Sequence, residues 1–186
     1  MSRMKLTPTP LAGLTLIDTS PVGDERGRFV RVSCEVELAG LLADLHFRQA
    51  NLSTTARRGT VRGMHFQHPP HADAKLIRCL RGRVFDVAVD LRAGSATLLH
   101  WHAVELDADG QREVFIPAGF AHGFQTLTDE VELLYLHTAD WDPASEGRLR
   151  PDDPALGIAW PMAVTLMSER DRDAPLLDPS FEGIRA

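Results

Sequence analysis

The segment from Gly59 to Arg78 reads Gly-Thr-Val-Arg-Gly-Met-His-Phe-Gln-His-Pro-Pro-His-Ala-Asp-Ala-Lys-Leu-Ile-Arg, with three histidines, two arginines and a lysine between two apolar alternations. Residues 60–67 have the length and bounding signals of a β-strand. Residues 68–73 carry a Pro-Pro turn, and residues 74–80 return to period-two alternation. The polar groups of this segment are therefore predicted to lie on strands.

Two of these polar side chains are unusual for strands with a buried face. Lys75 shares a face with Ile77 and Cys79, and an unpaired ammonium group among core residues is costly. His65 alternates with small and apolar residues, and Gly63 leaves room for something to approach the backbone. The pattern alone keeps ordinary alternatives open: Lys75 could reach water along its stem, and His65 could be a hydrogen-bonded core histidine.

Length and composition bound the class of protein. A chain of 186 residues with 44% hydrophobic residues fits one domain with a sizeable core. No apolar run is long enough to span a membrane, and Pro8 and Pro10 fall where a signal peptide needs an apolar segment. The two cysteines, Cys34 and Cys79, are expected to be reduced and buried. We therefore expect a cytoplasmic protein without a membrane partner.

The net charge of -6 argues against a general nucleic-acid binder, since phosphate neutralisation needs a basic surface. A local anion site is still compatible with this charge. Arg57, Arg58 and Arg62 cluster near the start of the central strand, and forked guanidinium groups suit a diphosphate. For Arg57 and Arg58 we prefer the interpretation of a solvated basic loop.

Short strands dominate the predicted secondary structure. One helix is predicted over residues 35–45, where five apolar residues approach helical spacing. Residues 21–27 have loop composition, and prolines break residues 142–186 into a loop-rich segment with a short helix starting near Ser168. Such strand spacing favours an antiparallel sandwich or barrel. The predicted strands cover residues 14–17, 29–34, 47–53, 60–67, 75–80, 84–91, 97–106, 113–117, 123–127 and 130–138.

A series of motifs runs in order from Asp24 to Leu177. They include RGMHFQ at 62–67, KLIR at 75–78, GRVFDVAVDLR at 82–92, IPAGFAHGF at 116–124, DPALGIAWP at 153–161 and SERD at 168–171. Together they resemble the dTDP-4-dehydrorhamnose 3,5-epimerase family. Residues 117–122 also fit the Pro-x-Gly-x-x-His element of cupins.

The resemblance implies a fold and an assembly. The expected fold class is all-β, a cupin-type double-stranded jelly roll with short peripheral helices, in one domain over residues 1–186. The resemblance also implies a homodimer in which N-terminal strands within residues 1–55 are exchanged between subunits.

The resemblance further implies epimerisation of a 4-keto-6-deoxy nucleotide sugar at C3 and C5, from dTDP-4-dehydro-6-deoxyglucose to dTDP-4-dehydrorhamnose. Inversion next to a ketone requires a base, a stabilised enolate and an acid on the opposite face. The matching motif positions assign His65 as the base, Asp171 as its partner, Lys75 to the enolate and Tyr135 as the acid. No metal or other cofactor is implied.

Further matching positions are implied to contact the substrate. Arg26 and Arg62 would bind the diphosphate, and His122 would assist at the enolate. Strict alternation turns Arg62 away from His65, so a bulge or bend at Gly63 is needed to bring both to the substrate. The full substrate-binding prediction is Arg26, Phe29, Gln49, Asn51, Arg62, His122 and Trp141.

Other interpretations of these residues remain open. From the residues alone, Asp171 would be a helix-start residue beside a capping Ser168, and Tyr135 a core aromatic. Departures from the family pattern at Arg31, Ala74, Asp140 and Pro151 leave the nucleotide and the number of inverted centres open.

Three alternative functions are compatible with the sequence. The first is a 3-only or 5-only epimerase of a related nucleotide sugar. The second is a metal-dependent cupin enzyme using His65, His68 and His122, or His100 and His102, although the usual companion ligands are missing. The third is a non-catalytic sugar-binding cupin, which would have no need of a base, its partner, a cation and an acid together.

Overall fold

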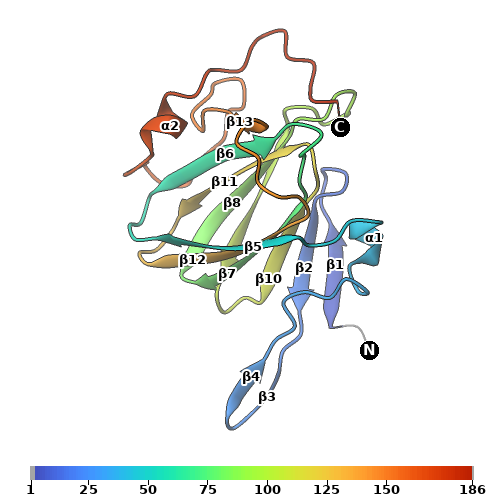
Figure 1. The fold of residues 1–186 in the computed structure, drawn as a ribbon. Helices are drawn as coiled ribbons and strands as arrows, with labels where there is room; N and C mark the ends of the chain where they lie inside the picture. Colours follow the sequence, from blue (N-terminus) through green and yellow to red (C-terminus); the bar gives the residue numbers. More distant parts are fainter. Residues whose placement is uncertain (1–2, 186) are drawn as a thin grey trace.

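Two facing antiparallel β-sheets make up most of the computed structural model, which describes residues 3–185 (Figure 1). The six-stranded sheet has the order β1 (Met4–Pro8), β2 (Thr15–Thr19), β10 (Arg112–Ile116), β7 (Lys75–Arg81), β12 (Val131–His137) and β5 (Gln49–Thr55). The five-stranded sheet has the order β13 (Glu146–Arg148), β6 (Val61–Gln67), β11 (Phe120–Thr126), β8 (Arg83–Asp90) and β9 (Trp101–Asp107). The predicted all-β jelly roll with short peripheral helices is confirmed.

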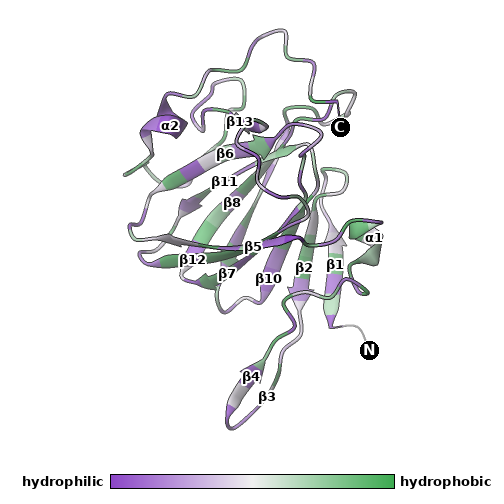
Figure 2. Cartoon of the chain, viewed as in Figure 1, coloured by the Kyte–Doolittle hydropathy of each residue, from purple (hydrophilic) through white to green (hydrophobic). Residues whose placement is uncertain are grey.

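The remaining elements are small. Strands β3 (Val22–Asp24) and β4 (Gly27–Phe29) form a hairpin that extends away from both sheets (Figure 1). Helices α1 (Ala39–Leu42) and α2 (Glu169–Arg172) each comprise a single turn; α1 is hydrophobic and α2 hydrophilic (Figure 2).

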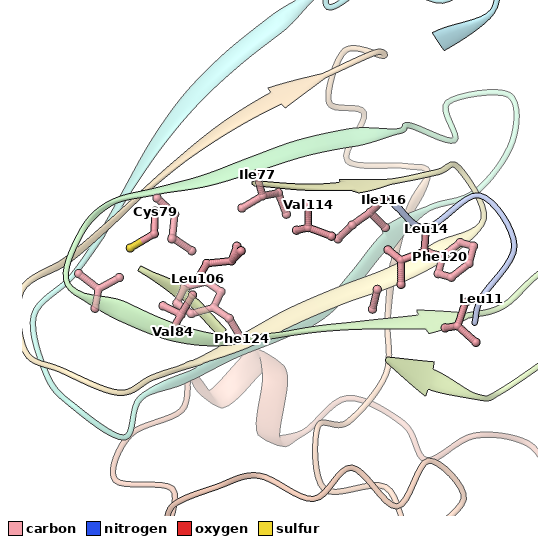
Figure 3. Close-up of a cluster of buried hydrophobic side chains, with 13 residues drawn as sticks. Leu11, Leu14, Ile77, Cys79, Val84, Leu106, Val114, Ile116, Phe120 and Phe124 are labelled. Carbon is pink, nitrogen blue, oxygen red and sulfur yellow. The ribbon is translucent and has the colours of Figure 1, made fainter. Parts of the chain in front are cut away.

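The main core lies between the two sheets, because alternate residues of each strand point inward. In β7, Ile77 and Cys79 face this core, and β11 contributes Phe120 and Phe124 from the other sheet; Phe120 lies at the end of the cluster beside Leu14 and Ile116 (Figure 3). The cluster consists of Leu11, Leu14, Ile77, Cys79, Val84, Ala88, Leu106, Val114, Ile116, Phe120, Phe124, Val131 and Leu133.

Two smaller clusters cover the outer faces of the sheets. Leu149, Leu156 and Ile184 of the loop-rich C-terminal segment pack on the five-stranded sheet, where they meet Met64 and Phe66. On the six-stranded sheet, Leu38 and Leu42 around α1 pack with Met4, Ile17, Leu76 and Phe115. The C-terminal segment is thereby held against β6, the strand that carries His65.

The prediction of a helix over residues 35–45 is wrong in extent. Only Ala39–Leu42 is helical, and Leu38 at its N-terminal boundary supplies no side-chain cap. The spacing of Leu38 and Leu42 fits one buried turn, whereas Val36 is 86% exposed and has no apolar surface to cover. Propensity without caps or a continuous apolar face does not sustain a longer helix.

Two neighbouring predictions also need correction. The strand predicted over residues 29–34 is present only at Phe29, and the loop predicted over residues 21–27 is mostly hairpin. Here Arg31 turns back to form an ion pair with Glu37, which competes with an extended course of the chain. Of the cysteines, Cys79 is buried as predicted, whereas Cys34 is only partly buried; both are free thiols.

The other predicted strands are present with shifted ends. Strand β9 begins at Trp101 rather than near residue 97, because residues 93–99 form turns. Strands β1 and β13 were not predicted, the first because of its prolines and the second because of its short length. None of the helices between residues 3 and 185 has the length and apolar character needed to cross a membrane.

Candidate active site

A pocket of about 460 Å³ lies between the two sheets at the end away from the β1 edge. Eight of the eleven predicted site residues line it: Gln49, Asn51, Arg62, His65, Lys75, His122, Tyr135 and Trp141. Its other lining residues are Ser53, Phe66, Gln67, Asp73, Phe124, His137, Ala139 and Glu146.

A bulge in β6 brings Arg62 and His65 to the same pocket. Opposite β11, His65 pairs with His122 and Arg62 pairs with Phe124, so β6 has one more residue than its partner over this interval. Gly63 allows the close approach: its φ is +132°, and a Cβ there would lie 2.5 Å from the Cα of Gly123. The predicted irregularity at Gly63 is confirmed.

The side chain of Asp171 holds the ring of His65. His65 Nε2 lies 2.7 Å from Asp171 Oδ1, and the Asp171 side chain is only 5% exposed. Asp171 also has the helix-start role, because its backbone N–H donates to Ser168 Oγ at 3.1 Å. The cap fixes the first turn of α2 and thereby the position of the carboxylate.

This contact determines the tautomer of His65. Burial acts to raise the pKa of Asp171, but the hydrogen bond and charge of His65 outweigh it and hold the pKa below its usual range. A carboxylate 2.7 Å from Nε2 requires a proton on that nitrogen. Among residues 3–185, Nδ1 has no hydrogen-bond partner, so it is the nitrogen available to accept a proton.

The ammonium group of Lys75 is paired inside the pocket wall. Its Nζ donates to Asp73 Oδ1 at 2.8 Å, and the Lys75 side chain is 10% exposed. Asp73 Oδ2 lies 2.8 Å from His137 Nδ1. Burial acts to raise the pKa of Asp73, but the His137 hydrogen bond and the Lys75 charge lower it below its usual range. Lys75 therefore has a buried partner, and its side chain does not extend along its stem to water.

Tyr135 lines the pocket from β12, on the sheet that faces His65. Its ring stacks on His137 at 5.8 Å and meets His122 edge-on at 5.8 Å. Burial, aided by the charge of Asp86, raises the pKa of the Tyr135 hydroxyl, so the group stays protonated at neutral pH. No hydrogen-bond partner for this hydroxyl lies within the described residues.

His122 is held from its own sheet. Its Nε2 lies 2.8 Å from Asp86 Oδ2, and both side chains are almost fully buried. Three imidazoles therefore line the pocket, and each is bound by a carboxylate: His65 by Asp171, His122 by Asp86 and His137 by Asp73.

A family model described as dTDP-4-dehydrorhamnose 3,5-epimerase matches residues 8–179. The chain belongs to this epimerase family. A dTDP-4-dehydrorhamnose 3,5-epimerase of Sinorhizobium fredii is 44% identical over 90% of this chain and 86% of the relative. A dTDP-4-dehydrorhamnose 3-epimerase of Streptomyces niveus is 42% identical over 94% of this chain and 84% of the relative.

Solved structures agree with this membership. The epimerase of Legionella pneumophila Philadelphia 1, in complex with dTDP-4-keto-L-rhamnose, superposes with a TM-score of 0.90 at 36% identity, covering 98% of each chain. The resemblance noted in the motifs is thus confirmed over most of the chain. The relatives include both a 3,5-epimerase and a 3-epimerase by name, so membership alone leaves the number of inverted centres open.

Two predicted substrate contacts of this epimerase-family chain do not reach its own pocket. Arg26 and Phe29 lie on or beside the projecting β3–β4 hairpin, where Phe29 is 73% exposed and Arg26 pairs with Asp24 (Figure 1). Within this chain, the structure does not bring Arg26 and Phe29 to the other predicted site residues.

The metal alternative has no ligand set in the described part of the epimerase chain. Between residues 3 and 185, no three His, Cys, Asp or Glu side chains converge as a metal site would require. His68 packs its ring edge-on against Phe66 at 5.0 Å. His65 and His122 each bind a separate carboxylate.

Sequence reasoning missed Asp73, His137, Arg148 and Glu146. Asp73 lies two residues from Lys75, so the spacing of the pair was a usable signal. His137 shares the inward face of β12 with Tyr135, which alternation could have indicated. Arg148 and Glu146 belong to β13, a three-residue strand that the sequence did not indicate because prolines lie on both sides of it.

Proposed function

We propose that this chain epimerises dTDP-4-dehydro-6-deoxyglucose at C3 and C5, giving dTDP-4-dehydrorhamnose. The observation that carries the proposal is the placement of the two proton-transfer groups. His65 comes from the five-stranded sheet and Tyr135 from the six-stranded sheet, and both line one pocket. A sugar ring bound between the sheets would present opposite faces to them.

The first step is removal of a proton from the carbon next to the C4 ketone. Nδ1 of His65 accepts this proton, and the carboxylate of Asp171 stabilises the resulting imidazolium through Nε2. A positioned general base contributes about a factor of 100 to 10,000 in rate. The electron pair of the broken C–H bond moves into the enolate.

The enolate oxygen needs a cation or a hydrogen-bond donor. Lys75 supplies a buried ammonium group whose partner, Asp73, is shared with His137. Because Nζ has three donors and the residues that the structure describes take one of them, at Asp73, two remain for the substrate oxygen. Loss of such a donor costs about 3 to 4 kcal/mol of transition-state stabilisation in comparable sites.

The second step returns a proton from the opposite face. We assign this acid role to Tyr135, because its hydroxyl is protonated and has no hydrogen-bond partner within the described residues. The hydroxyl can therefore donate its proton to the carbanion carbon. Donation at the carbon re-forms the ketone with inverted configuration. Solvent then reprotonates the tyrosinate and takes up the proton from the His65 imidazolium, so both groups return to their starting forms.

The remaining contacts would hold the nucleotide diphosphate. Arg62 Nη1 donates to Ser53 Oγ at 3.0 Å and to Thr55 Oγ1 at 3.3 Å, which aims the guanidinium along β5. Gln49 and Asn51 lie further along the same strand. The backbone N–H of Trp141 donates a hydrogen bond to Gln49 Oε1 at 3.2 Å, which holds Trp141 beside this strand. A diphosphate at Arg62 would thus place the nucleoside toward Trp141.

Solvent exchange tests this function. In D₂O, wild-type protein given dTDP-4-dehydro-6-deoxyglucose should incorporate deuterium at C3 and C5 and form the inverted sugar, as NMR and mass spectrometry would record. Label at C3 alone would narrow the activity to a 3-epimerase. Tight substrate binding without any label would contradict catalysis and favour a sugar-binding cupin.

We also propose that the functional unit is a homodimer. The outer face of the six-stranded sheet exposes Leu52 and Leu80, which are 59% and 42% exposed, beside the partly buried Leu134. Apolar groups gathered on one face support an interface. The exposed Phe29 on the hairpin gives a second apolar group that a partner's pocket would accommodate.

Subunit mixing tests the dimer and the role of Arg26 together. Sedimentation at micromolar concentration should give a dimer. Arg26→Ala and His65→Ala proteins should each have low activity, whereas a mixture refolded together should recover about a quarter of wild-type activity, because half the dimers then contain one intact composite site. A monomer, or a mixture no more active than its components, would contradict the proposal.

A further inference from the structure

A third group binds the His65–Asp171 pair. Arg148 lies opposite His65 in the pairing of β13 with β6. Its Nη1 lies 2.9 Å from Asp171 Oδ1 and 3.0 Å from His65 Nε2. Because Nε2 carries the proton that binds Asp171, it cannot accept a hydrogen bond from Nη1. Nη1 therefore donates to Asp171 Oδ1, and the two donors, Nε2 and Nη1, share this oxygen.

The guanidinium of Arg148 is fixed in this position. Its Nη2 donates to Glu146 Oε1, and Glu146 Oε2 in turn accepts from Arg170 Nη2 at 3.2 Å. The side chains of Arg148 and Glu146 are 18% and 17% exposed. Glu146 therefore fixes the far end of the guanidinium, and Nη1 is left to donate beside the imidazole, with the cationic charge delocalised over the whole group.

Charged groups near the His65 ring affect how readily the ring takes up a proton, and several elements contribute such groups. A cation in contact with the ring disfavours the imidazolium, and a cation that shares Asp171 weakens the effect of the carboxylate that binds the ring. The charged or titratable groups that line the pocket or contact the pair are Arg62 on β6, His122 on β11, Glu146 and Arg148 on β13, Asp171 on α2, and Asp73, Lys75, Tyr135 and His137 across the pocket. Arg170 of α2 contacts Glu146 from the surface, where its side chain is 72% exposed. Of the cations, only Arg148 contacts both the ring and its carboxylate within residues 3–185.

We propose that Arg148 is a positioning residue that keeps His65 in its neutral, proton-accepting form and sets the lower pH limit of the epimerase. This inference rests on the proposed role of His65 as the base. The forked donor holds Asp171 Oδ1 in place, and its charge opposes protonation of the ring before substrate binds. The pH profile therefore depends on β13 as well as on the two members of the pair.

Replacing Arg148 should shift the pH dependence. In Arg148→Met, the acidic limb of the kcat/KM profile should move up by about one pH unit, since a single neighbouring charge shifts a titration by about that much. At a pH one unit below the new midpoint, the variant should be about tenfold less active than its own plateau. Arg148→Lys keeps the charge but loses the fork, so it should keep the wild-type midpoint with a lower plateau.

Arg150→Met is the matched control. Arg150 is two residues away and pairs with Asp152 at the surface, without contact with His65 or Asp171. It should retain both the midpoint and the plateau of the wild type. An Arg148→Met profile identical to that of Arg150→Met would overturn the proposal, as would an equal midpoint shift in Arg148→Lys and Arg148→Met.

A direct measurement separates this inference from the proposed function. The ¹⁵N signals of the His65 ring, assigned by comparison with His65→Gln protein, can be titrated without substrate. The ring of Arg148→Met should protonate at higher pH than the wild-type ring, even if neither protein epimerises the sugar. If Arg148→Met does not fold, Arg148→Lys still decides the matter: a midpoint displaced upward from wild type would contradict the role of the charge.

Discussion

His65→Ala is expected to lose both solvent exchange and inversion, each by about a factor of 100 to 10,000, which is the contribution of a positioned general base. We expect no second base to replace it, because His65 is the most exposed of the three imidazoles that line the pocket, at 38% against 6% for His122 and 16% for His137. The other two imidazoles, His122 and His137, each bind a carboxylate of their own, and His137 is also stacked on Tyr135. Exchange kinetics in D₂O and product NMR would measure both losses.

His68→Ala is the control for this experiment. His68 is three residues away, packs edge-on against Phe66 and does not line the pocket, so its removal should leave exchange at the wild-type rate. Circular dichroism and thermal unfolding would verify that both variants are folded. A folded His65→Ala protein with wild-type exchange would remove His65 from the mechanism.

The sequence predicted the two-sheet fold because its strands alternate cleanly where they pack. Ile77 and Cys79 face the inter-sheet core from β7, as the period-two pattern indicated. The failures lie where tertiary contacts override local pattern. Val36 belongs to an apolar spacing typical of a helix, yet only one turn forms, because Leu38, Leu41 and Leu42 pack on the sheet while Val36 and Leu45 stay exposed.

The site was predictable to the extent that its residues lie in motifs. His65 and Tyr135 were each indicated by resemblance, and the structure brings them to one pocket from different sheets. The conflict between Arg62 and strict alternation was itself informative, because it required the bulge that β6 contains at Gly63. A local rule that fails at one residue can therefore point to a functional irregularity.

Partners that arise from long-range pairing were not predictable. Arg148 contacts His65 only because β13 pairs with β6 across 83 residues of chain. No spacing rule connects two such positions. Likewise, the Asp73 carboxylate reaches His137 across 64 residues, so the sequence indicated the lysine but not the network that holds it.

Tyr135→Phe is expected to separate exchange from inversion. The ring that stacks on His137 and meets His122 is retained, so the pocket should keep its shape while the proton donor is lost. His65 would still remove the substrate proton. Because the His65 side chain is 38% exposed, the imidazolium can exchange with solvent and return a deuteron to the same face. The variant should therefore label the substrate with its configuration retained.

The inverted product of Tyr135→Phe should fall by about a factor of 100 to 10,000, which a positioned general acid contributes. Label position and sugar configuration, read from one NMR time course, would record both effects in the same sample. Wild-type levels of inverted sugar would exclude Tyr135 as the acid. If exchange were lost together with inversion in a folded variant that still binds dTDP, the hydroxyl would be needed before reprotonation. Base and acid roles could then no longer be divided between the two sheets.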